Sequence, residues 1–404
     1  MSISLPALAG EPNSLVPTRI DDASSAVATP APAAAPAPAP PSREKLATPP
    51  IGFQGSDAQR ARQRDAAMRD YGAIQSQLVL DGGSALRVRE RAGSDAPATA
   101  WPHGQVVAAA LDRALVGGDV NEARKALAGL KRFEAGSTGS FNPTEGGGTQ
   151  DRFYDDNAWI GLDYMQGLKL TSDGQYLDDA KRVFSFLEQG LHADGGLLWK
   201  ENEPNPARAA ASMGPTMQLA LQLYRETGEQ HYMDVAKNID GAQNRLLRNG
   251  SGLIMDNVKN DGHVDDWVFS YNQGTSVGAD VQFYDATGDT KYLDRAKSTA
   301  SAALDFFARD DQLWKQPPAF NAIMFRNLLK LDAVAPDPRI RATLERYVAR
   351  AEQASRQDDG LYAPKDGMGQ YEGKDGATSV IDQAAMVQMH ALLAMTPEQL
   401  VTVA

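Results

Sequence analysis

Three stretches of the chain repeat one another and decide the fold: TSDGQYLDDAKRVFSFL from Thr171, TGEQHYMDVAKNIDGAQ from Thr227 and TGDTKYLDRAKSTASAA from Thr287. Their starts are offset by about 56 and then about 60 residues. Each copy has a polar, glycine-containing turn, then an aromatic residue, then a segment with the apolar spacing of an amphipathic helix. A repeat of this length indicates a supersecondary unit that recurs along the chain.

Each repeated turn links two predicted helices. The first copy places apolar residues on one helical face, at Leu177, Ala180, Phe184 and Leu187. Apolar segments also precede the second and third turns, namely TMQLALQLY (216–224) and TSVGADVQFY (275–284). One period therefore predicts a helical hairpin, in which two helices are joined by a short turn.

A second element recurs after these hairpins as a glycine-containing loop: DGGLLW from Asp194, SGLIMD from Ser251 and DGLYAP from Asp359. Its recurrence suggests equivalent loops at one end of each hairpin. Residues 55–400, divided by the repeat period, accommodate about six hairpins. We therefore predict an all-α fold, an (α/α)6 barrel over residues 55–400, with an open solenoid as the alternative.

The start of the chain differs in composition from the rest. The Ala/Pro tract TPAPAAAPAPAPP (29–41) lacks the side chains to pack a core, so residues 1–50 are predicted to form a disordered tail. Helical signals begin near Gln59. The first residues, MSISLPALAGEPNS, lack a basic region and a long apolar stretch, so we expect no standard signal peptide. Localisation stays open between the cytoplasm and export by a non-Sec route.

Composition excludes several classes of function. The chain is 42% hydrophobic and 23% charged, which is ordinary for a globular protein. Its net charge of -12 argues against a nucleic-acid partner, since phosphate backbones are bound by clustered Lys and Arg. There are no cysteines, so disulfides and thiolate chemistry are absent. No segment approaches the roughly 18 apolar residues of a membrane span, and we expect a monomer.

The densest chemical signal is RFYDDNAWIGLDYMQGLKL, from Arg152. Asp155 and Asp156 precede a predicted helix, where acidic residues often serve as caps. As a pair they also suit glycoside hydrolysis, which needs one carboxylate and one carboxylic acid. Mutual repulsion raises one of the two pKa values, which separates these roles. Tyr154 and Trp159 are predicted to contact a sugar.

A second polar cluster lies in WVFSYNQGTSVGAD (267–280). Tyr271, Asn272 and Gln273 offer a hydroxyl and two amides, which suit hydrogen bonds to sugar hydroxyls. Helix capping and loop closure explain the same residues equally well. Asp265 and Asp266, a second acidic pair just upstream, compete with Asp155 and Asp156 for the catalytic role by chemistry alone.

The remaining polar motifs point to structure rather than to chemistry. Arg326 lies among apolar residues and is predicted to be structural, and Asp382 is predicted to cap the last inner helix. The five histidines form no H-E-x-x-H pattern. We therefore predict no metal site and no cofactor.

Several of these motifs together resemble glycoside hydrolase family 76. The resemblance rests on YDDNAWIGLD from Tyr154, SYNQG from Ser270, FNAIMFRNLL from Phe320 and DQAAMVQ from Asp382, in the expected order, and on the TGDxxYL turns. It implies an (α/α)6 barrel that acts with retention on α-1,6-linked mannose polymers. It further implies that Asp155 is the nucleophile and Asp156 the acid/base, and it places Tyr271, Asn272 and Gln273 near the glycan.

Three other functions compete with this interpretation. One is transfer to another glycan instead of hydrolysis, since the family includes members that act on glycan remnants of lipid anchors. Another is a sugar epimerase or isomerase on the same barrel, which usually needs histidines as acid and base. The third is a glycan-binding barrel without catalysis. The retained Asp155 and Asp156 and the scattered histidines disfavour the last two.

Overall fold

The computed structural model describes residues 55–147, 151–371 and 376–403. Contacts between residues divide the chain into two units, Met1–Ala39 and Pro40–Ala404, and every described residue belongs to the second. The predicted tail, residues 1–50, lies outside the described residues.

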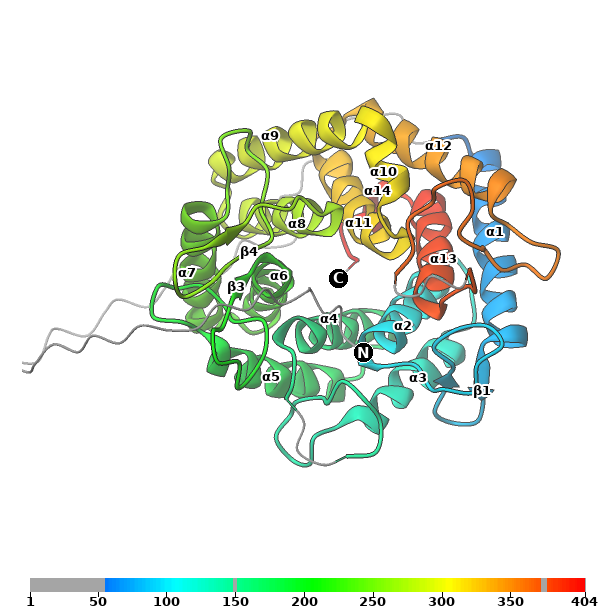
Figure 1. Ribbon diagram of the computed structural model, residues 1–404, viewed down its shortest axis with the longest axis horizontal. Coiled ribbons are helices and arrows are strands. Elements are labelled where there is room, and N and C mark those ends of the chain that lie inside the picture. Colours follow the sequence, from blue (N-terminus) through cyan, green and yellow to red (C-terminus); the bar gives the residue numbers. More distant parts are fainter. Residues whose placement is uncertain (1–54, 148–150, 372–375, 404) are drawn as a thin grey trace, which may run out of the picture. The chain divides into compact units, whose positions relative to one another are not determined.

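An inner ring of helices forms the centre of this unit (Figure 1). It consists of α2 (Ala100–Leu115), α4 (Tyr154–Thr171), α6 (Ala210–Thr227), α8 (Ser270–Thr287), α11 (Pro318–Val334) and α13 (Val380–Ala394). Each packs on the next, and α13 packs on α2. This last contact closes the ring, so the predicted barrel is confirmed and the open solenoid is wrong.

An outer ring of helices surrounds the inner one. It consists of α1 (Asp57–Gln77), α3 (Val120–Gly129), α5 (Gln175–Leu187), α7 (Gln230–Leu246), α9 (Thr290–Phe307) and α12 (Pro338–Ala354). The three repeated stretches of sequence form α5, α7 and α9, each packed on the inner helix that precedes it. Helix α1 packs on α13, so the first and last helices of the barrel lie together. Short helical segments complete the described elements: η2 (Leu130–Phe133), η3 (Glu188–Gly190), η4 (Arg309–Asp311), α10 (Gln312–Lys315) and α14 (Pro397–Leu400).

The repeated turns end the inner helices in the left-handed conformation. Gly228 after α6 and Gly288 after α8 have φ of 73° and 70°. Ser172 takes the same position after α4 with φ of 59°. A side chain in this conformation costs about 1 kcal/mol, which explains why glycine stands there in the other two copies.

The inner helices approach one another closely. Gly274 of α8 lies so near α11 that a Cβ would come within 2.5 Å of the Met324 backbone. Arg326 of α11 is buried and pairs with Asp112 of α2, with one hydrogen bond of 3.0 Å, so its predicted structural role is confirmed. Helix α13 begins at Val380 with Ser379 as its N-cap, so the prediction that Asp382 is the cap is wrong.

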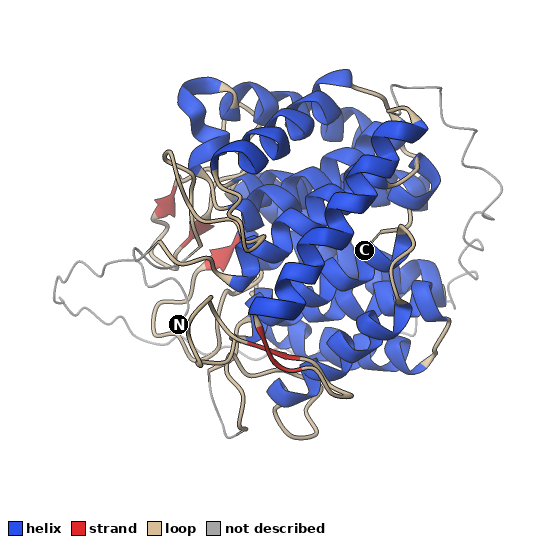
Figure 2. Cartoon of the chain, turned by 90° about the vertical axis from the view of Figure 1, so that its right-hand side faces the viewer, coloured by secondary structure: helices blue, strands red, loops and turns tan. Residues whose placement is uncertain are grey.

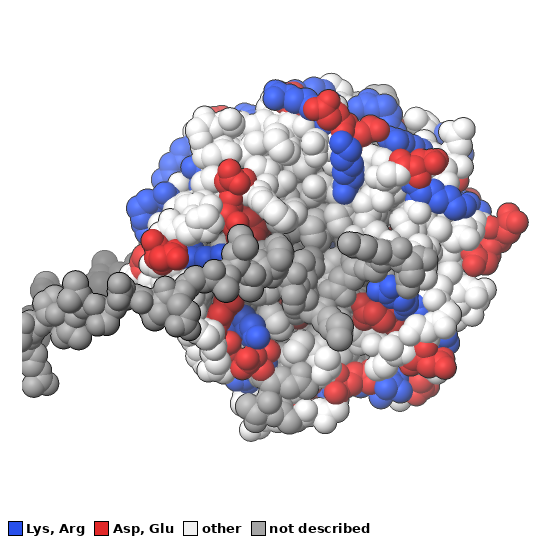
Figure 3. All heavy atoms as spheres, in the orientation of Figure 1, with Lys and Arg blue, Asp and Glu red and all other residues white. Residues whose placement is uncertain are grey.

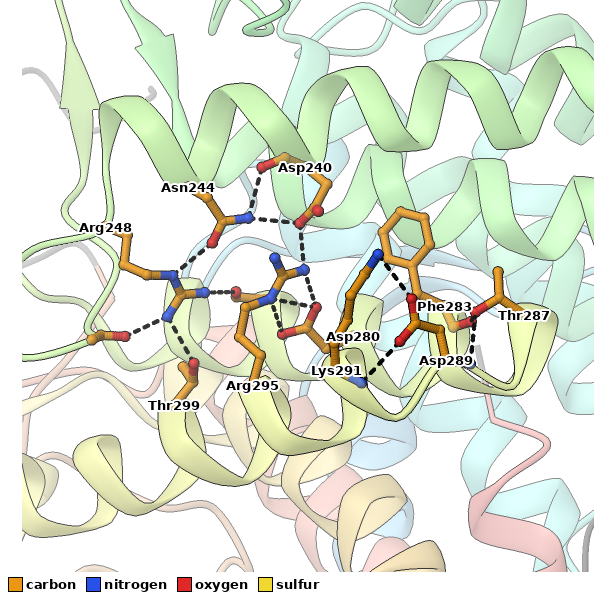
Figure 4. A network of polar contacts seen from close by, with 12 residues as sticks. Asp240, Asn244, Arg248, Asp280, Phe283, Thr287, Asp289, Lys291, Arg295 and Thr299 are labelled. Atoms are coloured by element: carbon orange, nitrogen blue, oxygen red, sulfur yellow. Dashed lines mark hydrogen bonds and ion pairs between the residues drawn. The ribbon is translucent and has the colours of Figure 1, made fainter.

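Polar contacts also tie neighbouring hairpins together between the inner and outer helices. In Figure 4, Arg295 of α9 lies between Asp280 of α8 and Asp240 of α7, and its Nε is 2.9 Å from each Asp280 oxygen. Arg248 donates to Thr299 of α9 over 2.8 Å. Burial raises the pKa of Asp280 to about 6, although Arg295 acts in the opposite direction. The network joins three consecutive elements that the repeat places side by side.

Longer loops and short strands gather at the end of the barrel where the inner helices begin, here called the loop end (Figure 2). The strands are β1 (Val79–Asp81), β2 (Arg87–Val88), β3 (Arg208–Ala209), β4 (Asn257–Val258) and β5 (Val264–Asp265). Strands β1 and β2 pair with each other, and β3, β4 and β5 form an antiparallel sheet in that order.

The repeated glycine-containing loops are equivalent, as predicted. Each closes on itself through an isolated bridge: Leu191 with Leu197, Arg248 with Ile254, and Arg356 with Tyr362.

Acidic and basic side chains are interspersed around the visible rim of the face shown in Figure 3. No described helix is both long and apolar enough to cross a membrane.

Candidate active site

Asp155 and Asp156 lie inside the first turn of α4, at the loop end of the barrel. The N-cap of α4 is Phe153, and no side chain caps this helix. Neither aspartate is therefore the N-cap, although both stand in the first turn and Asp155 accepts a backbone N–H there, that of Asp156. Both aspartates are partly exposed, whereas Asn157 and Ala158, the next residues of the turn, are buried.

The carboxylate of Asp155 is held through both of its oxygens. The indole Nε1 of Trp199 donates to Oδ2 over 3.0 Å, and the backbone N–H of Asp156 donates to Oδ1 over 3.0 Å. The Trp199 ring is itself held by edge contact with Phe153, with 5.0 Å between ring centres. Two donors in fixed positions favour the ionised form of Asp155 and orient it.

The carboxyl group of Asp156 is held by no hydrogen bond from the described part of the chain. It differs in this from Asp155, its direct neighbour. A carboxyl group that is partly exposed and has no protein partner is available to a ligand.

The pKa values of both aspartates are raised, chiefly by burial, and the further causes differ. Burial raises the pKa of Asp155 to about 6, against the hydrogen bond from Trp199. Burial raises the pKa of Asp156 well above its usual value, and the negative charge of Asp155 raises it further. Since the charge of Asp155 disfavours a second charge on Asp156, the arrangement favours a pair in which Asp155 carries the charge and Asp156 keeps the proton, as a nucleophile and an acid require.

A third carboxylate, Asp256, connects this pair to the second polar cluster. It accepts hydrogen bonds from Asn257 Nδ2 (2.9 Å), Asn272 Nδ2 (3.2 Å) and Tyr271 Oη (3.5 Å). The charge of Asp256 contributes to the raised pKa of Asp155, after burial. The charges of Asp256 and Asp155 both raise the pKa of Tyr271, again after burial. Residues more than a hundred positions apart in the sequence thus meet at the loop end.

The three residues of the predicted YNQ cluster have different surroundings. Tyr271 is partly exposed, whereas Asn272 and Gln273 are buried. The Gln273 amide accepts from the N–H of Ile254 and donates to its C=O, both over 2.8 Å. Gln273 therefore holds the loop that carries Asp256, which argues against a direct contact with a sugar.

The same hydrogen bond, from a loop N–H to an amide side chain, recurs in other hairpins at the fourth residue of the inner helix. Asn157 of α4 accepts from the N–H of Phe141 over 2.7 Å, and Gln383 of α13 accepts from the N–H of Tyr362 over 3.1 Å. The recurrence indicates that the position serves the fold.

The two aromatic residues predicted to contact a sugar point in different directions. Tyr154 is buried, and its ring stacks on Phe186 of the outer helix α5 with 5.0 Å between centres. This placement argues against a contact with a glycan. Trp159 is partly exposed and follows Asp156 by three residues, so it shares a helix face with Asp156 one turn further along α4.

Sequence reasoning missed Trp199 and Asp256 as site residues. Each stands two residues after the residue that closes a repeated loop by a β-bridge: Trp199 follows Leu197, and Asp256 follows Ile254. Their backbone carbonyls accept from the first N–H of the neighbouring inner helices, Trp199 from Tyr154 (2.9 Å) and Asp256 from Ala210 (2.8 Å). The repeated loops DGGLLW and SGLIMD could have indicated these two residues, because the loops end in Trp199 and Asp256 at the same relative position.

The rival acidic pair is arranged differently. Asp265 accepts from Asn257 over 3.3 Å, and Asp266 is exposed. No described contact joins either residue to Asp155.

Other potential sites lie away from Asp155 and Asp156. Within the described residues, no group of three or more His, Asp or Glu side chains could hold a metal ion. A cavity of about 340 Å³ lies at the opposite end of the barrel, lined by Arg60, Leu115 and Ala394 among others. The predicted site residues do not line it.

Most of the chain is similar to a known protein family. Residues 87–404 match the profile of glycosyl hydrolase family 76. A region of 192 residues is 27% identical to mannan endo-1,6-alpha-mannosidase DCW1 of Saccharomyces cerevisiae. That match covers 43% of this chain and 42% of the yeast protein, so it spans less than half of that relative.

Solved structures show the same fold. A family 76 glycoside hydrolase from a bovine Bacteroides thetaiotaomicron strain superposes with a TM-score of 0.72 at 24% identity, covering 82% of this chain and 77% of that one. An inactive variant of the α-1,6-mannanase of Salegentibacter sp. HEL1_6, with two adjacent aspartates replaced, was solved with α-1,6-mannotriose. It superposes with a TM-score of 0.68 at 22% identity, covering 82% of this chain and 99% of that one.

The family match extends over most of the chain and includes both the α4 aspartates and the YNQ segment. The solved relatives have the same helical barrel. The chain therefore belongs to glycosyl hydrolase family 76.

Proposed function

We propose that this protein is a retaining endo-α-1,6-mannanase, with Asp155 as nucleophile and Asp156 as general acid/base. The observation that carries the proposal is the pair itself: adjacent, partly exposed carboxyl groups in one helical turn, of which Asp155 is held by two donors and Asp156 by none from the described residues. The α-1,6-mannanase of Salegentibacter supports the substrate class, because replacement of two adjacent aspartates leaves it inactive but bound to α-1,6-mannotriose.

In the first step, the Asp155 carboxylate attacks the anomeric carbon of the mannosyl unit. The bond between that carbon and the glycosidic oxygen breaks, and Asp156 gives its proton to the departing oxygen. A covalent mannosyl ester on Asp155 results. Trp199 and the Asp156 N–H keep the Asp155 carboxylate oriented for this attack.

In the second step, the ionised Asp156 takes a proton from water while the water oxygen attacks the same carbon. The ester bond to Asp155 breaks, and the product keeps the anomeric configuration of the substrate. Asp256, Tyr271 and Asn272 form a polar wall next to Asp155, and we assign the accessible Tyr271 to the sugar hydroxyls.

The proposal is tested by hydrolysis of a linear α-1,6-mannan. We expect short oligomers from internal cleavage, and product anomers followed by NMR should show retention. Release of mannose alone would contradict endo action, and inversion would contradict the nucleophile role of Asp155. Absence of cleavage on any mannan would overturn the substrate class. Products longer than the substrate would reveal transfer.

A further inference from the structure

Trp267 is the most exposed large apolar side chain in the described part of the protein, with 53% of its surface accessible. It lies between β5 and α8, at the loop end. A single exposed apolar side chain is common on a protein surface, so the role of Trp267 is judged from the residues that it contacts.

Trp267 is the outer member of a row of aromatic rings. Its ring centre lies 5.7 Å from that of Phe269, in edge contact, and Phe269 stacks on Tyr271 at 5.7 Å with 12° between the planes. Trp267 and Phe269 stand two residues apart before α8, where Phe269 has extended backbone angles, and Tyr271 is the second residue of α8. Alternate residues of an extended segment point to the same side.

The inner part of the row is fixed by packing. Phe320 of α11 contacts both inner rings, with 5.6 Å to the Phe269 centre and 4.5 Å to the Tyr271 centre. The Tyr271 hydroxyl then reaches Asp256 over 3.5 Å, and the charge of Asp256 acts on Asp155. The row therefore leads from the carboxylates to an exposed indole, with Phe269 and Tyr271 in between.

We propose that Trp267 is a stacking platform for a mannosyl unit of the substrate that lies away from the cleaved bond. The apolar C–H face of a pyranose ring matches the flat indole, and an uncharged sugar needs no counter-charge there. Because two aromatic rings separate Trp267 from Asp256, the unit on Trp267 is not the one attacked by Asp155. This inference rests on the proposed mannanase function and adds a determinant of chain length to it.

The test compares kcat/KM of Trp267→Ala with that of the wild type on α-1,6-mannooligosaccharides of increasing length and on an aryl α-mannoside. Loss of one aromatic stacking contact should lower kcat/KM on long oligomers about tenfold. The aryl mannoside and the shortest cleaved oligomer, which do not reach Trp267, should be cleaved at the wild-type rate. Trp267→Phe should restore part of the rate on long oligomers. His263→Ala, at an exposed position between β4 and β5, is the matched control and should change nothing.

Each outcome decides the assignment. A rate loss confined to long oligomers supports the platform. Equal losses on long and short substrates would mean that Trp267 supports the fold around Tyr271, and unchanged rates throughout would mean that it contacts no sugar; either result overturns the inference while leaving the mannanase function in place. A wild-type protein that cleaves no α-1,6-mannan would overturn both proposals.

Discussion

The first turns of α4 and α13 carry an aspartate at the same position, and the two aspartates have opposite surroundings. Asp156 is the third residue of α4, and Asp382 is the third residue of α13. Asp382 is only 5% exposed and accepts from the Tyr371 N–H (2.9 Å), the Ser379 hydroxyl (2.8 Å) and more weakly the Ala319 N–H (3.4 Å). Asp156 receives no such bond from the described residues.

This difference separates a carboxylate that serves the fold from one that is available for chemistry. Burial raises the pKa of both groups, that of Asp382 to about 6 and that of Asp156 well above its usual value. The direction of the pKa shift therefore does not distinguish Asp382 from Asp156. The hydrogen-bond partners distinguish the two aspartates. A carboxyl group that lacks such partners lowers the stability of the free protein, and a ligand can supply the missing contacts.

The largest expected effect follows from replacing the proposed nucleophile. Asp155→Asn should lower the hydrolysis of α-1,6-mannan by about 10³-fold or more, because no covalent ester can form. Initial rates and a circular-dichroism melt would separate lost chemistry from lost structure. Asp382→Asn is the matched control, whose folded fraction should keep its activity per molecule. Full activity in Asp155→Asn would turn attention to Asp265 and Asp256.

The next effect depends on the leaving group. Asp156→Asn should slow the cleavage of mannan by about 10²–10⁴-fold, the usual contribution of general acid assistance. An aryl α-mannoside with an acidic phenol needs little protonation and should lose far less. The comparison of the two substrates is the measurement, and equal losses on both would contradict the acid role of Asp156.

A third prediction tests the structural role of Asp382. Asp382→Ala should destabilise the protein by about 1–3 kcal/mol, because the Tyr371 N–H and the Ser379 hydroxyl lose their acceptor. Chemical denaturation would measure the loss of free energy of unfolding. Asp156→Ala removes a carboxyl group that accepts no hydrogen bond from the described residues, and it should cost less. A larger cost for Asp156→Ala would reverse the roles assigned to these two residues.

The smallest effect concerns pH and stability. Because folding raises the pKa of Asp155 from 3.8 to about 6, its contribution to stability is present below pH 4 and is lost as pH rises through 6. Asp155→Asn lacks this titration. Its melting temperature relative to wild type should therefore rise by a few degrees between pH 4 and pH 7. A constant difference across this range would show that Asp155 titrates as an ordinary surface carboxyl group.

The sequence alone was sufficient for the hairpins and for the catalytic pair as a candidate. Repeat period, apolar spacing and turn glycines are local properties, and the three copies at Thr171, Thr227 and Thr287 predicted the paired helices α5, α7 and α9 with their inner partners. The Asp155–Asp156 pair was visible for the same reason, because both residues stand together in one segment.

Only the tertiary structure decided which polar residues face the site. Each step along a helix turns the side chain by about 100°, so Tyr154 packs against α5 while Asp156, two residues later, stays accessible. Trp199 and Asp256 reach Asp155 because loops of successive hairpins close over neighbouring inner helices. Asp382 differs from Asp156 through Tyr371 and Ala319, which lie outside its own helix. Such partners come from segments far apart in the chain, and local periodicity carries no information about which of them will meet.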